Sequence, residues 1–426
     1  MSRGDGQEKM MGDIQEIVKE VLKQAKETNG PGAMEELERL VEGGGREIMR
    51  KLFEMTVGEW TKVHGGEAKR CGCGGDNNKG ERQREILTHW GVISLRREYR
   101  RCERCDHSDF AGDQELGVER DMVSPRLRQT VTLLGTVMAY EQVPEVLWWG
   151  FRLRMTAEQV KRITQGVGAD AVRMEEEDRP VKRDSGAGYE GEWYLMIDAS
   201  SVNTVDGWRD VRNAVFRSRD GEETRYVADL ISYEEFGGHL RRYGGSLGIK
   251  ETSQVIALAD GLEANWKLIR VNYPGAREIL DFYHAAEKIW ETGRVVYGEG
   301  TQACRGWSEE QCGQMKELGP GPLLKEMEKR IPRQKEEKKR ETLETLARYV
   351  RTNESRMNYP QYIREGLLIG SGPVESACKG VTGARLRGTG MRWTVENVRR
   401  MAHLRAIYKS GLWSELWKQR RLALAA

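Results

Sequence analysis

The sequence predicts a mixed α/β protein, in which a mixed sheet is interrupted by a helical insertion and preceded by helical and cysteine-bearing segments. Three observations predict this class: apolar stretches that end on a carboxylate, a long charged helical stretch, and two close pairs of cysteines. With 426 residues, the chain is long enough to form several domains with separate cores.

The composition predicts a soluble, globular protein with heavily charged surfaces, because 38% of the residues are hydrophobic and 32% are charged. The formal net charge of +2 excludes no class of partner. The sequence contains no run of 18 apolar residues, so no membrane span is expected. Because the N-terminus lacks the apolar core of a signal peptide, we expect a cytoplasmic protein with reduced thiols.

Residues 1–63 have apolar side chains at helical spacing and predict a helical arm. The glycines and proline of residues 29–32 should separate two helices, and Gly43 to Gly45 should mark a further turn. Such an arm is either a dimerisation element or a helical hairpin that packs on its own domain.

Residues 64–120 carry two close cysteine pairs about thirty residues apart, which is the spacing of a four-cysteine zinc ribbon. Four thiolates select tetrahedral zinc, and a closed set of four is structural. The predicted Zn²⁺ ligands are Cys71, Cys73, Cys102 and Cys105, with His64 and His107 as spare candidates. Arginines at 96, 97, 100 and 101 either contact phosphate or form a solvated strand face.

Residues 121–178 predict three short helices, with a helix N-terminus at Ser124 and a capping box at Thr156 and Gln159. This pattern is compatible with a helix-turn-helix that places Gln159 and Arg162 near a DNA major groove. A purely structural helix trio is the alternative. The charged stretch from Glu175 to Gly188, which contains Pro180 and Gly186, predicts a linker.

The stretch from Tyr194 to Ser201 predicts a buried central strand, because apolar residues occupy both of its faces. Asp198 stands where this strand should stop. A carboxylate in this position is costly unless a cation or hydrogen-bond donors satisfy it. The simpler alternative is an aspartate that caps a turn.

The next strands, at residues 211–216 and 226–231, should form an antiparallel meander with the first strand. A later apolar strand ends at Asp260, and another ends at Asp281. Glu375 falls in the first turn of a helix whose natural N-cap is Ser371 and which has Pro373 in its first turn.

If the later strand packs beside the first, Asp198 and Asp260 come together, and a helix crossing the sheet adds Glu375. This is the ribonuclease-H-like arrangement. Three carboxylates suit Mg²⁺ or Mn²⁺ rather than zinc. Two such ions can activate a nucleophile and stabilise the leaving oxygen in phosphodiester chemistry.

The C-terminal region from residue 376 onwards is basic, with eleven Lys or Arg residues against two Glu. Basic residues on a glycine-rich loop suit a phosphate backbone, and the indole of Trp393 suits stacking on an unpaired base. The candidate DNA-contacting residues here are Lys379, Arg385, Arg387, Arg392 and Trp393. A basic helix face is the alternative, and both can hold at once.

Over roughly residues 120–415, the chain resembles the transposases of ISKra-type insertion sequences, which are DDE enzymes related to the Mutator-like group. The resemblance is carried by Ile197-Asp198, the segment 208–216, Asp260 with its neighbours, Asp281 to His284, and the segments 370–379 and 383–393.

This resemblance implies a ribonuclease-H-like catalytic core, a helical insertion, and metal-ligand roles for Asp198, Asp260 and Glu375. Asp281 and His284 match an Asp-x-x-His element of related transposases, which gives them supporting roles. Asp281 is also the alternative for the second catalytic position. The expected domains are a helical arm (1–63), a zinc ribbon (64–120), a helical DNA-binding domain (121–178), the core (189–284 and 366–426) and the insertion (285–365).

The sequence therefore predicts a metal-dependent enzyme of DNA transposition, a form of DNA recombination, that cleaves the ends of a mobile element and joins them to target DNA. Its expected partners are double-stranded DNA and further copies of the chain, with no membrane. Two alternatives remain: a ribonuclease-H-like nuclease, and a zinc-containing DNA-binding protein that has lost catalysis.

Overall fold

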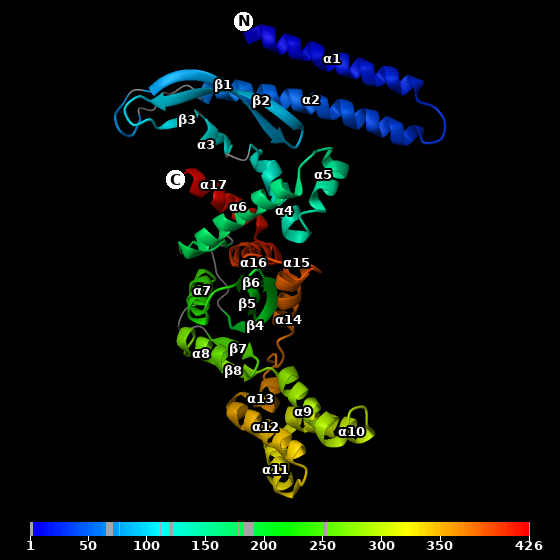
Figure 1. Ribbon diagram of the computed structural model, residues 1–426, viewed down its shortest axis with the longest axis vertical. Coiled ribbons are helices and arrows are strands. Elements are labelled where there is room, and N and C mark those ends of the chain that lie inside the picture. Colours follow the sequence, from blue (N-terminus) through cyan, green and yellow to red (C-terminus); the bar gives the residue numbers. More distant parts are fainter. Residues whose placement is uncertain are drawn as a thin grey trace. The chain divides into compact units, whose positions relative to one another are not determined.

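The computed structural model describes residues 3–64, 71–75, 77–110, 112–118, 122–177, 179–182, 191–249 and 254–425, and these form a mixed α/β protein with two separate sheets (Figure 1). Residues 183–188 of the predicted linker lie outside the described part, and its first two residues belong to a helix that ends at Glu176. The chain divides into two compact units, Met1–Thr164 with Trp417–Ala426, and Gln165–Leu416. No helix within the described residues is long and apolar enough to cross a membrane.

Two long helices open the first unit, α1 (Arg3–Glu27) and α2 (Ala33–His64). They are separated where Gly30 and Gly32 adopt positive φ angles of 82° and 89°, which glycine accepts without strain. The predicted further turn at Gly43 to Gly45 is wrong, because α2 is continuous through these residues. A Cβ at Gly44 would lie 2.5 Å from a methyl group of Val21, so glycine here permits close packing of the two helices.

A three-stranded antiparallel sheet follows, in the order β1-β2-β3. Its strands are β1 (Asn77–Thr88), β2 (Gly91–Cys102) and β3 (Ser108–Phe110). The buried residues Ile86, Ile93 and Leu95 pack against Phe53 and Val57 of α2. The sheet thus shares a small core with the preceding helix.

The remaining helices of this unit are α3 (Asp113–Leu116), α4 (Pro125–Val137), α5 (Val143–Phe151) and the start of α6 (Ala157–Glu176). Ser124 caps α4, as predicted, by accepting a hydrogen bond from the backbone N–H of Leu127. The predicted capping box is also present, because Thr156 and Gln159 exchange side-chain to backbone hydrogen bonds of 2.8 and 3.2 Å.

The second unit is built on a five-stranded mixed sheet with the order β6-β5-β4-β7-β8. The strands are β4 (Trp193–Thr204), β5 (Gly207–Ser218), β6 (Thr224–Asp229), β7 (Val255–Ala259) and β8 (Arg277–Leu280). The first three are antiparallel, whereas β7 and β8 add in parallel beside β4. The predicted meander, with the later strand next to the central first strand, is confirmed.

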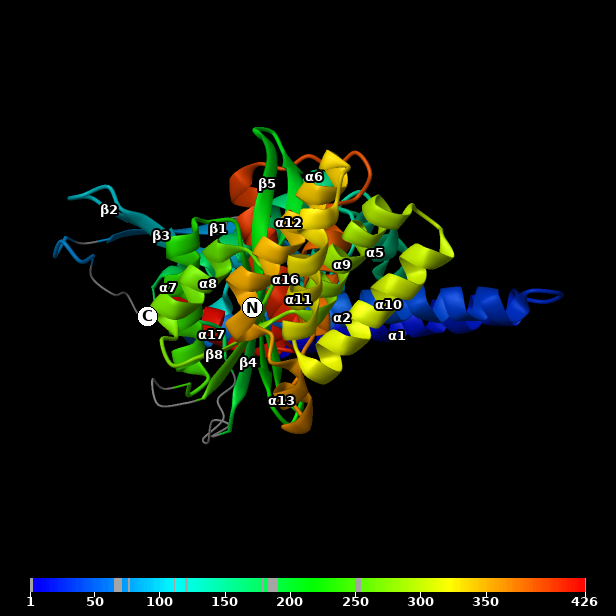
Figure 2. The ribbon, with the colours of Figure 1, turned by 90° about the horizontal axis from the view of Figure 1, so that it is seen from below.

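The prediction that this strand stops at Asp198 is wrong. Strand β4 continues for six more residues to Thr204. In this outer half, the side chains on one face of the sheet are buried: Ser200, Val202 and Thr204. Strand β4 pairs with β5 along its whole length. The apolar run therefore marks only the fully buried half of a longer hairpin. The tip of this hairpin extends past the helices α7 and α8 (Figure 2).

Helices cover both faces of the five-stranded sheet (Figure 1). On one face, Phe216 of β5 packs against Tyr243 of α7 (Tyr233–Ser246) and near Tyr273, which follows α8 (Glu263–Asn272). On the other face, Thr382 donates a 2.8 Å hydrogen bond to Asn213 of β5 from the turn that follows α14 (Gly372–Ala377).

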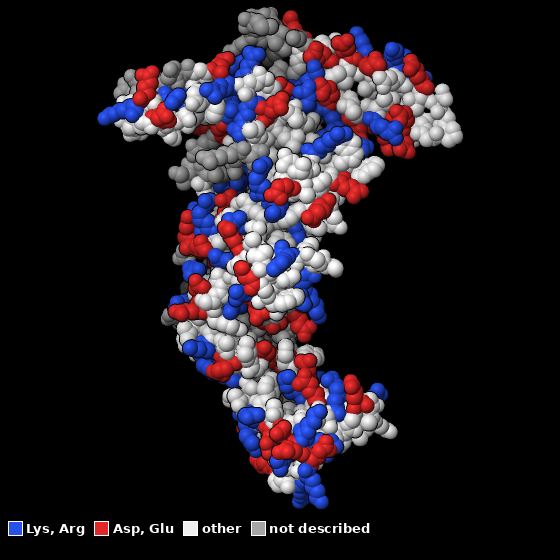
Figure 3. Space-filling model, viewed as in Figure 1, with Lys and Arg blue, Asp and Glu red and all other residues white. Residues whose placement is uncertain are grey.

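Between β8 and α14 the chain is helical, as expected for the charged stretch. The helices are α9 (Phe282–Tyr297), α10 (Gln302–Leu318), α11 (Gly321–Arg330), α12 (Glu337–Asn353) and α13 (Tyr359–Arg364), with short 3-10 turns at Ile331–Arg333 and Glu354–Arg356. Acidic and basic side chains are interspersed over the face of these helices seen in Figure 3. The charge run is therefore a solvated surface.

After α14 the chain forms a π-helical segment (Cys378–Gly383), α15 (Ala384–Leu386), α16 (Val395–Lys409) and α17 (Trp413–Ala425). The loop before α16 lies beside the tip of the β4–β5 hairpin. There, Val205 donates to the carbonyl oxygen of Trp393 at 2.8 Å, and Trp393 donates to that of Asn203 at 3.2 Å. The glycine-rich basic loop is thus anchored to the sheet.

Candidate functional site

The strand register places Asp198 and Asp260 side by side. Ile197 and Ala259, the residues just before them, are direct partners on the parallel strands β4 and β7. Neighbouring strands lie about 4.8 Å apart, and residues at equal register in a parallel pair project from the same face. The two carboxylates therefore start from adjacent positions on one face of the sheet.

Asp281 occupies the next place in the same row, because Leu280 pairs with Ala259. Its carboxylate is 1% exposed and is already held by several donors. It accepts hydrogen bonds from the backbone N–H groups of Tyr283 at 2.7 Å and Ser371 at 3.0 Å, and from the Ser371 hydroxyl. Both oxygens of Asp281 are therefore occupied. Asp260 also accepts two hydrogen bonds, from the backbone N–H of Leu262 at 3.0 Å and the side chain of Asn265 at 2.9 Å, but both go to Oδ1, so the geometry favours Asp260 for the second catalytic position.

The hydroxyl of Ser371 has a different role from the one predicted. Ser371 is the N-cap residue of α14, but its side chain makes no cap hydrogen bond and donates to Asp281 instead. Pro373 and Glu375 do lie in the first turn of this helix, as predicted. Asp281 and Ser371 therefore tie the start of α9 to the start of α14.

His284 is half-buried and lies against the carboxylate row, with its Nδ1 atom 3.4 Å from Oδ2 of Asp281. The adjacent Asp281 carboxylate raises the pKa of His284 to about 9, and the negative charges of Asp260 and Asp198 add to this effect. His284 is thus a cation at neutral pH that offsets the charge of three aligned carboxylates.

Cys378, which the sequence analysis did not single out, joins α14 to the carboxylate row. Its thiol donates to Oδ2 of Asp198 at 3.3 Å. Burial raises the pKa of Cys378 to about 12, with further contributions from the negative charges of Asp198 and Glu375. Glu375 and Asp198 therefore face a common neighbour, although Glu375 itself is 48% exposed and lies 3.4 Å from Lys379.

The three predicted magnesium ligands fit a hard cation in type, because all are carboxylates. Among the described residues, however, they do not gather within 4.8 Å of one another. Asp198 and Asp260 stand in register, whereas the exposed side chain of Glu375 would have to turn inward from α14 to complete the set.

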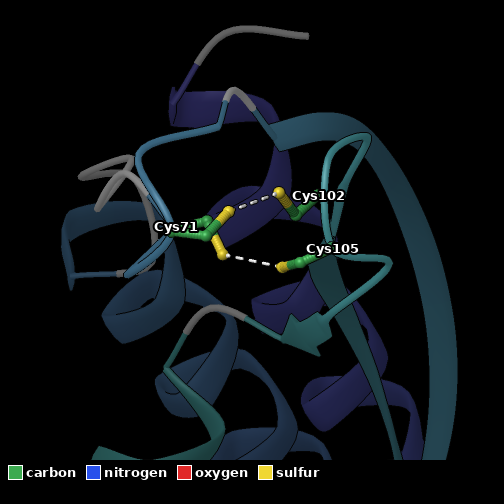
Figure 4. A group of neighbouring side chains, drawn as sticks. Cys71, Cys102 and Cys105 are labelled. Atoms are coloured by element: carbon green, nitrogen blue, oxygen red, sulfur yellow. Dashed lines mark hydrogen bonds between the residues drawn. The ribbon is translucent and has the colours of Figure 1, made fainter.

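The four cysteines predicted as zinc ligands do converge (Figure 4). All four sulfur atoms lie within 4.8 Å of one another, with 3.4 Å between Cys71 and Cys105 and 3.5 Å between Cys73 and Cys102. A tight turn brings each pair together, and Gly74 supplies the positive φ of 77° that the first turn needs. The cluster is compatible with tetrahedral zinc.

The thiols of this cluster influence one another strongly. The backbone N–H of Cys105 lowers the pKa of Cys102 to about 6. The N–H of His107 favours the thiolate of Cys105, yet the neighbouring sulfurs raise its pKa to about 12. All four groups would be thiolates together only around a bound cation. The spare candidates His64 and His107 are not part of this group; His64 instead stacks on Trp60.

The arginines of strand β2 do not form one solvated face. Arg97 and Arg100 are buried; Arg97 pairs with Asp113 and lies over the ring of Phe110, while Arg100 pairs with Glu98. In the helical segment, Oε1 of Gln159 accepts a hydrogen bond in the cap of α6, while the side chain remains exposed, so contact with bases stays a prediction. Arg162 is exposed on the same helix.

The basic C-terminal loop contains both structural and exposed residues. Trp393 is 8% exposed, and Arg385 is buried over its ring at 5.1 Å, so neither side chain is presented to DNA as predicted. Arg387, Arg392 and Lys379 are exposed. Arg392 donates to the Val205 carbonyl oxygen at 3.1 Å, which fixes the loop to the hairpin tip.

Trp208 is an exposed aromatic residue in this region. In the sequence it was noted only as the first residue of the segment 208–216, which carries the family resemblance. It is 68% exposed at the tip of the β4–β5 hairpin, beside Val205. The glycine turn before it, at Gly207 with a φ of 94°, was the available signal. A tryptophan directly after a hairpin turn has little neighbouring structure to cover it.

Comparison with known proteins does not assign a function to these sites. No protein-family model matches the chain, and no curated protein matches it. The assignment of a function therefore depends on the geometry of the carboxylate row and the cysteine cluster.

Proposed function

We propose that the protein is a DDE transposase with a ribonuclease-H-like core, which cleaves the ends of an insertion sequence and joins them to target DNA. One observation carries the proposal: Asp198 and Asp260 stand in register on adjacent parallel strands of a sheet in which a three-stranded meander precedes the parallel strands. Glu375 follows on a helix that is hydrogen-bonded to the first of these carboxylates through Cys378.

Two further features support this proposal over an unrelated carboxylate site. The helical segment between β8 and α14 separates Asp260 from Glu375 in the chain, as the resemblance implies. The four-cysteine cluster and the helices α4 and α5 precede the carboxylate-bearing unit, where a transposase would carry its DNA-binding parts.

In this proposal, Asp198, Asp260 and Glu375 hold magnesium or manganese ions, which would activate the attacking hydroxyl group and stabilise the leaving oxygen. Water first attacks a phosphodiester at the element end and releases a 3′-hydroxyl. That hydroxyl then attacks a target phosphodiester, so one bond forms as another breaks in each step. His284 and Asp281 position the carboxylate row, and Cys378 orients Asp198.

Lys379, Arg387 and Arg392 are the exposed basic residues that would contact DNA phosphates near this site, and Arg162 is the corresponding candidate on α6. Arg385 and Trp393 act indirectly by supporting the loop that carries Arg387 and Arg392. Trp208 is an exposed aromatic side chain available for contact with DNA.

The proposal is tested by incubating the protein and magnesium with a labelled duplex that carries the DNA flanking its own coding sequence. Wild type should nick this duplex and join the new end to a target plasmid, and Glu375→Gln should do neither while still binding the duplex. The matched control is Glu341→Gln on exposed helix α12, which should behave as wild type.

Each other outcome favours one alternative. Cleavage without joining indicates a ribonuclease-H-like nuclease. Duplex binding without metal-dependent cleavage indicates a DNA-binding protein that has lost catalysis, and it would remove the proposed role of Glu375.

A further inference from the structure

A second group of metal-ligand side chains lies at the edge of the five-stranded sheet. It consists of Asp229 at the end of β6, His239 on α7 and His403 on α16, with Glu175 of α6 beside it. All four residues are buried, with no more than 7% of any of them exposed, and all belong to one compact unit. This group is separate from the carboxylate row, since strand β5 lies between β6 and β4.

The three inner side chains present their ligating atoms to a common point. The carboxylate Oδ2 of Asp229 lies 3.0 Å from Nε2 of His403 and 3.9 Å from Nδ1 of His239. The two imidazole rings are nearly parallel, at an interplanar angle of 14° and a centroid distance of 5.4 Å. One ligand atom from each residue lies within 4.8 Å of the other two, as one small cation requires.

The atoms that face away from this point are held by other groups. Nε2 of His239 lies 2.9 Å from Oε1 of Glu175, although the two groups are not aligned as a hydrogen bond. A small rotation of the imidazole would let this carboxylate accept the ring proton and leave Nδ1 unprotonated for a metal. A carboxylate behind a ligating histidine fixes its tautomer and ring orientation in many metal sites.

Asp229 is oriented in the same way. Its Oδ1 atom accepts hydrogen bonds from the backbone N–H of Leu230 at 2.7 Å and from Nε of Arg399 at 2.9 Å. The guanidinium of Arg399 also donates from Nη2 to Oδ2 at 3.2 Å. These bonds fix the carboxylate plane, and a metal would share Oδ2 with Arg399 on the side that faces the two histidines. Arg399 also offsets the charge of Glu176, at 3.2 Å, so the site does not depend on the metal alone to neutralise its carboxylates.

A cavity of about 280 Å³ opens onto this group and is lined by its four residues together with Arg242 and Gly238, among others. It offers space for water as a further ligand. Three protein ligands with one open position form a recognised type of zinc site, and imidazole nitrogen selects zinc, copper or nickel over magnesium.

We propose that Asp229, His239 and His403 bind a transition-metal dication, with zinc as the physiological ion, and that Glu175 positions His239. The metal ties edge strand β6 to helices α7 and α16. This inference is independent of the proposed transposase activity, because it concerns metal content and stability alone. The competing arrangement is a metal-free network, in which a protonated His403 forms a closed ion pair with Asp229.

The first measurement is the zinc content of the purified full chain after saturation with zinc and removal of the excess, by elemental mass spectrometry. Two equivalents per chain are expected, one at the four cysteines and one here. A zinc content of one equivalent per chain would overturn the proposal without any variant. The proposal would also fail if wild type bound two equivalents and replacement of Cys71 and Cys105 removed both.

Variants then assign the second ion. His403→Gln should remove one equivalent, whereas His107→Gln, at an exposed histidine outside both groups, should remove none. Should His403→Gln fold poorly, Glu175→Gln is the second variant. It keeps all three ligands and should weaken zinc affinity about 10–100-fold by releasing His239. Unchanged affinity in Glu175→Gln would contradict the assigned positioning role.

Cobalt gives a readout that separates the two sites. In Cys71→Ser/Cys105→Ser protein, added Co²⁺ should still produce the weak visible bands of nitrogen and oxygen coordination, without thiolate charge-transfer absorption. The bound ion should also raise the unfolding temperature of this variant. Absence of both effects would leave the ion-pair network as the correct description.

Discussion

The thiol of Cys378 donates a hydrogen bond to the carboxylate of Asp198 at 3.3 Å, although 180 residues separate the two in the chain. This bond links the end of helix α14, which carries Glu375, to the central strand of the sheet. It forms because the helical insertion brings the chain back to the face from which Asp198 projects. The proposed active site is therefore assembled from elements on both sides of the insertion.

We expect Cys378→Ala to slow metal-dependent cleavage roughly fivefold, since one hydrogen bond that orients Asp198 is worth about 1 kcal/mol. Cys378→Ser retains a donor and should remain close to wild type.

Asp198→Asn should lower the rate by at least about a thousandfold, because it removes a charge that would hold the metal, and metal ions supply several kcal/mol. Single-turnover cleavage of the flanking-sequence duplex measures all three rates.

Equal rates for Cys378→Ala and wild type would assign Cys378 to packing alone. Duplex binding, measured in the same samples, should be unchanged in every variant. A loss of binding in Asp198→Asn would show that the substitution disturbs more than catalysis.

We expect Asp281→Ala to destabilise the protein by about 3 kcal/mol. The change leaves the buried donors of Ser371 and Tyr283 without an acceptor and removes the cap of α9. Urea unfolding followed by tryptophan fluorescence measures the effect, with Glu341→Gln as the exposed control. A fully stable Asp281→Ala protein that lacks cleavage would instead return Asp281 to the second catalytic position.

The sequence was sufficient to predict most of the second sheet, because most of its strands contain a short apolar run, such as residues 193–197 of β4 and 255–259 of β7. The order of the strands followed from the rule that the parallel strands add beside the first. The length of β4 was not predictable, because its outer half alternates small polar and apolar residues after Asp198 and resembles a turn.

Side-chain placement was harder to predict than strand order. Arg385 and Trp393 were assigned to DNA from composition, yet they stack on each other in the protein interior. Basic and aromatic residues serve both purposes, and only the tertiary fold decides between them. The group of Asp229, His239 and His403 had no signal at all, since its members lie on three separate elements without a spacing pattern.

With zinc bound at the four cysteines, its removal should unfold the region around β1 to β3 while leaving the five-stranded sheet intact, since the four cysteines join the start of β1 to the end of β2. Structural zinc contributes directly to folding free energy, so Cys102→Ser should have the same effect as chelation. Hydrogen exchange of backbone amides in β2 measures the loss. Cys312→Ser, at a thiol outside the cluster, is the control and should exchange as wild type.

Two glycines of helix α6 provide a matched test of the packing between α6 and α16. A Cβ at Gly168 would lie 2.8 Å from Cβ of Arg400 and 3.0 Å from its carbonyl oxygen, whereas a Cβ at Gly166 would meet nothing within 4 Å. Gly168→Ala should therefore destabilise the protein by about 1–3 kcal/mol. Gly166→Ala should stabilise it by about 0.5–1 kcal/mol, because alanine favours the helix. Thermal unfolding of the two variants side by side checks both signs, and a stabilising Gly168→Ala would mean that the helices can separate without cost.

Arg385 and Arg387 are two residues apart in the chain, but their substitution should have different effects: one on DNA binding and the other on stability. Arg387 is exposed, so Arg387→Gln should weaken binding equally for all duplex sequences and reduce the slope of log affinity against log salt by about 1. Arg385 is buried over Trp393, so Arg385→Gln should lower the unfolding temperature and leave that slope unchanged. Fluorescence anisotropy at four salt concentrations separates the two effects. If Arg385→Gln alone reduced the slope, the loop would have to rearrange on DNA and expose the side chains that are buried here.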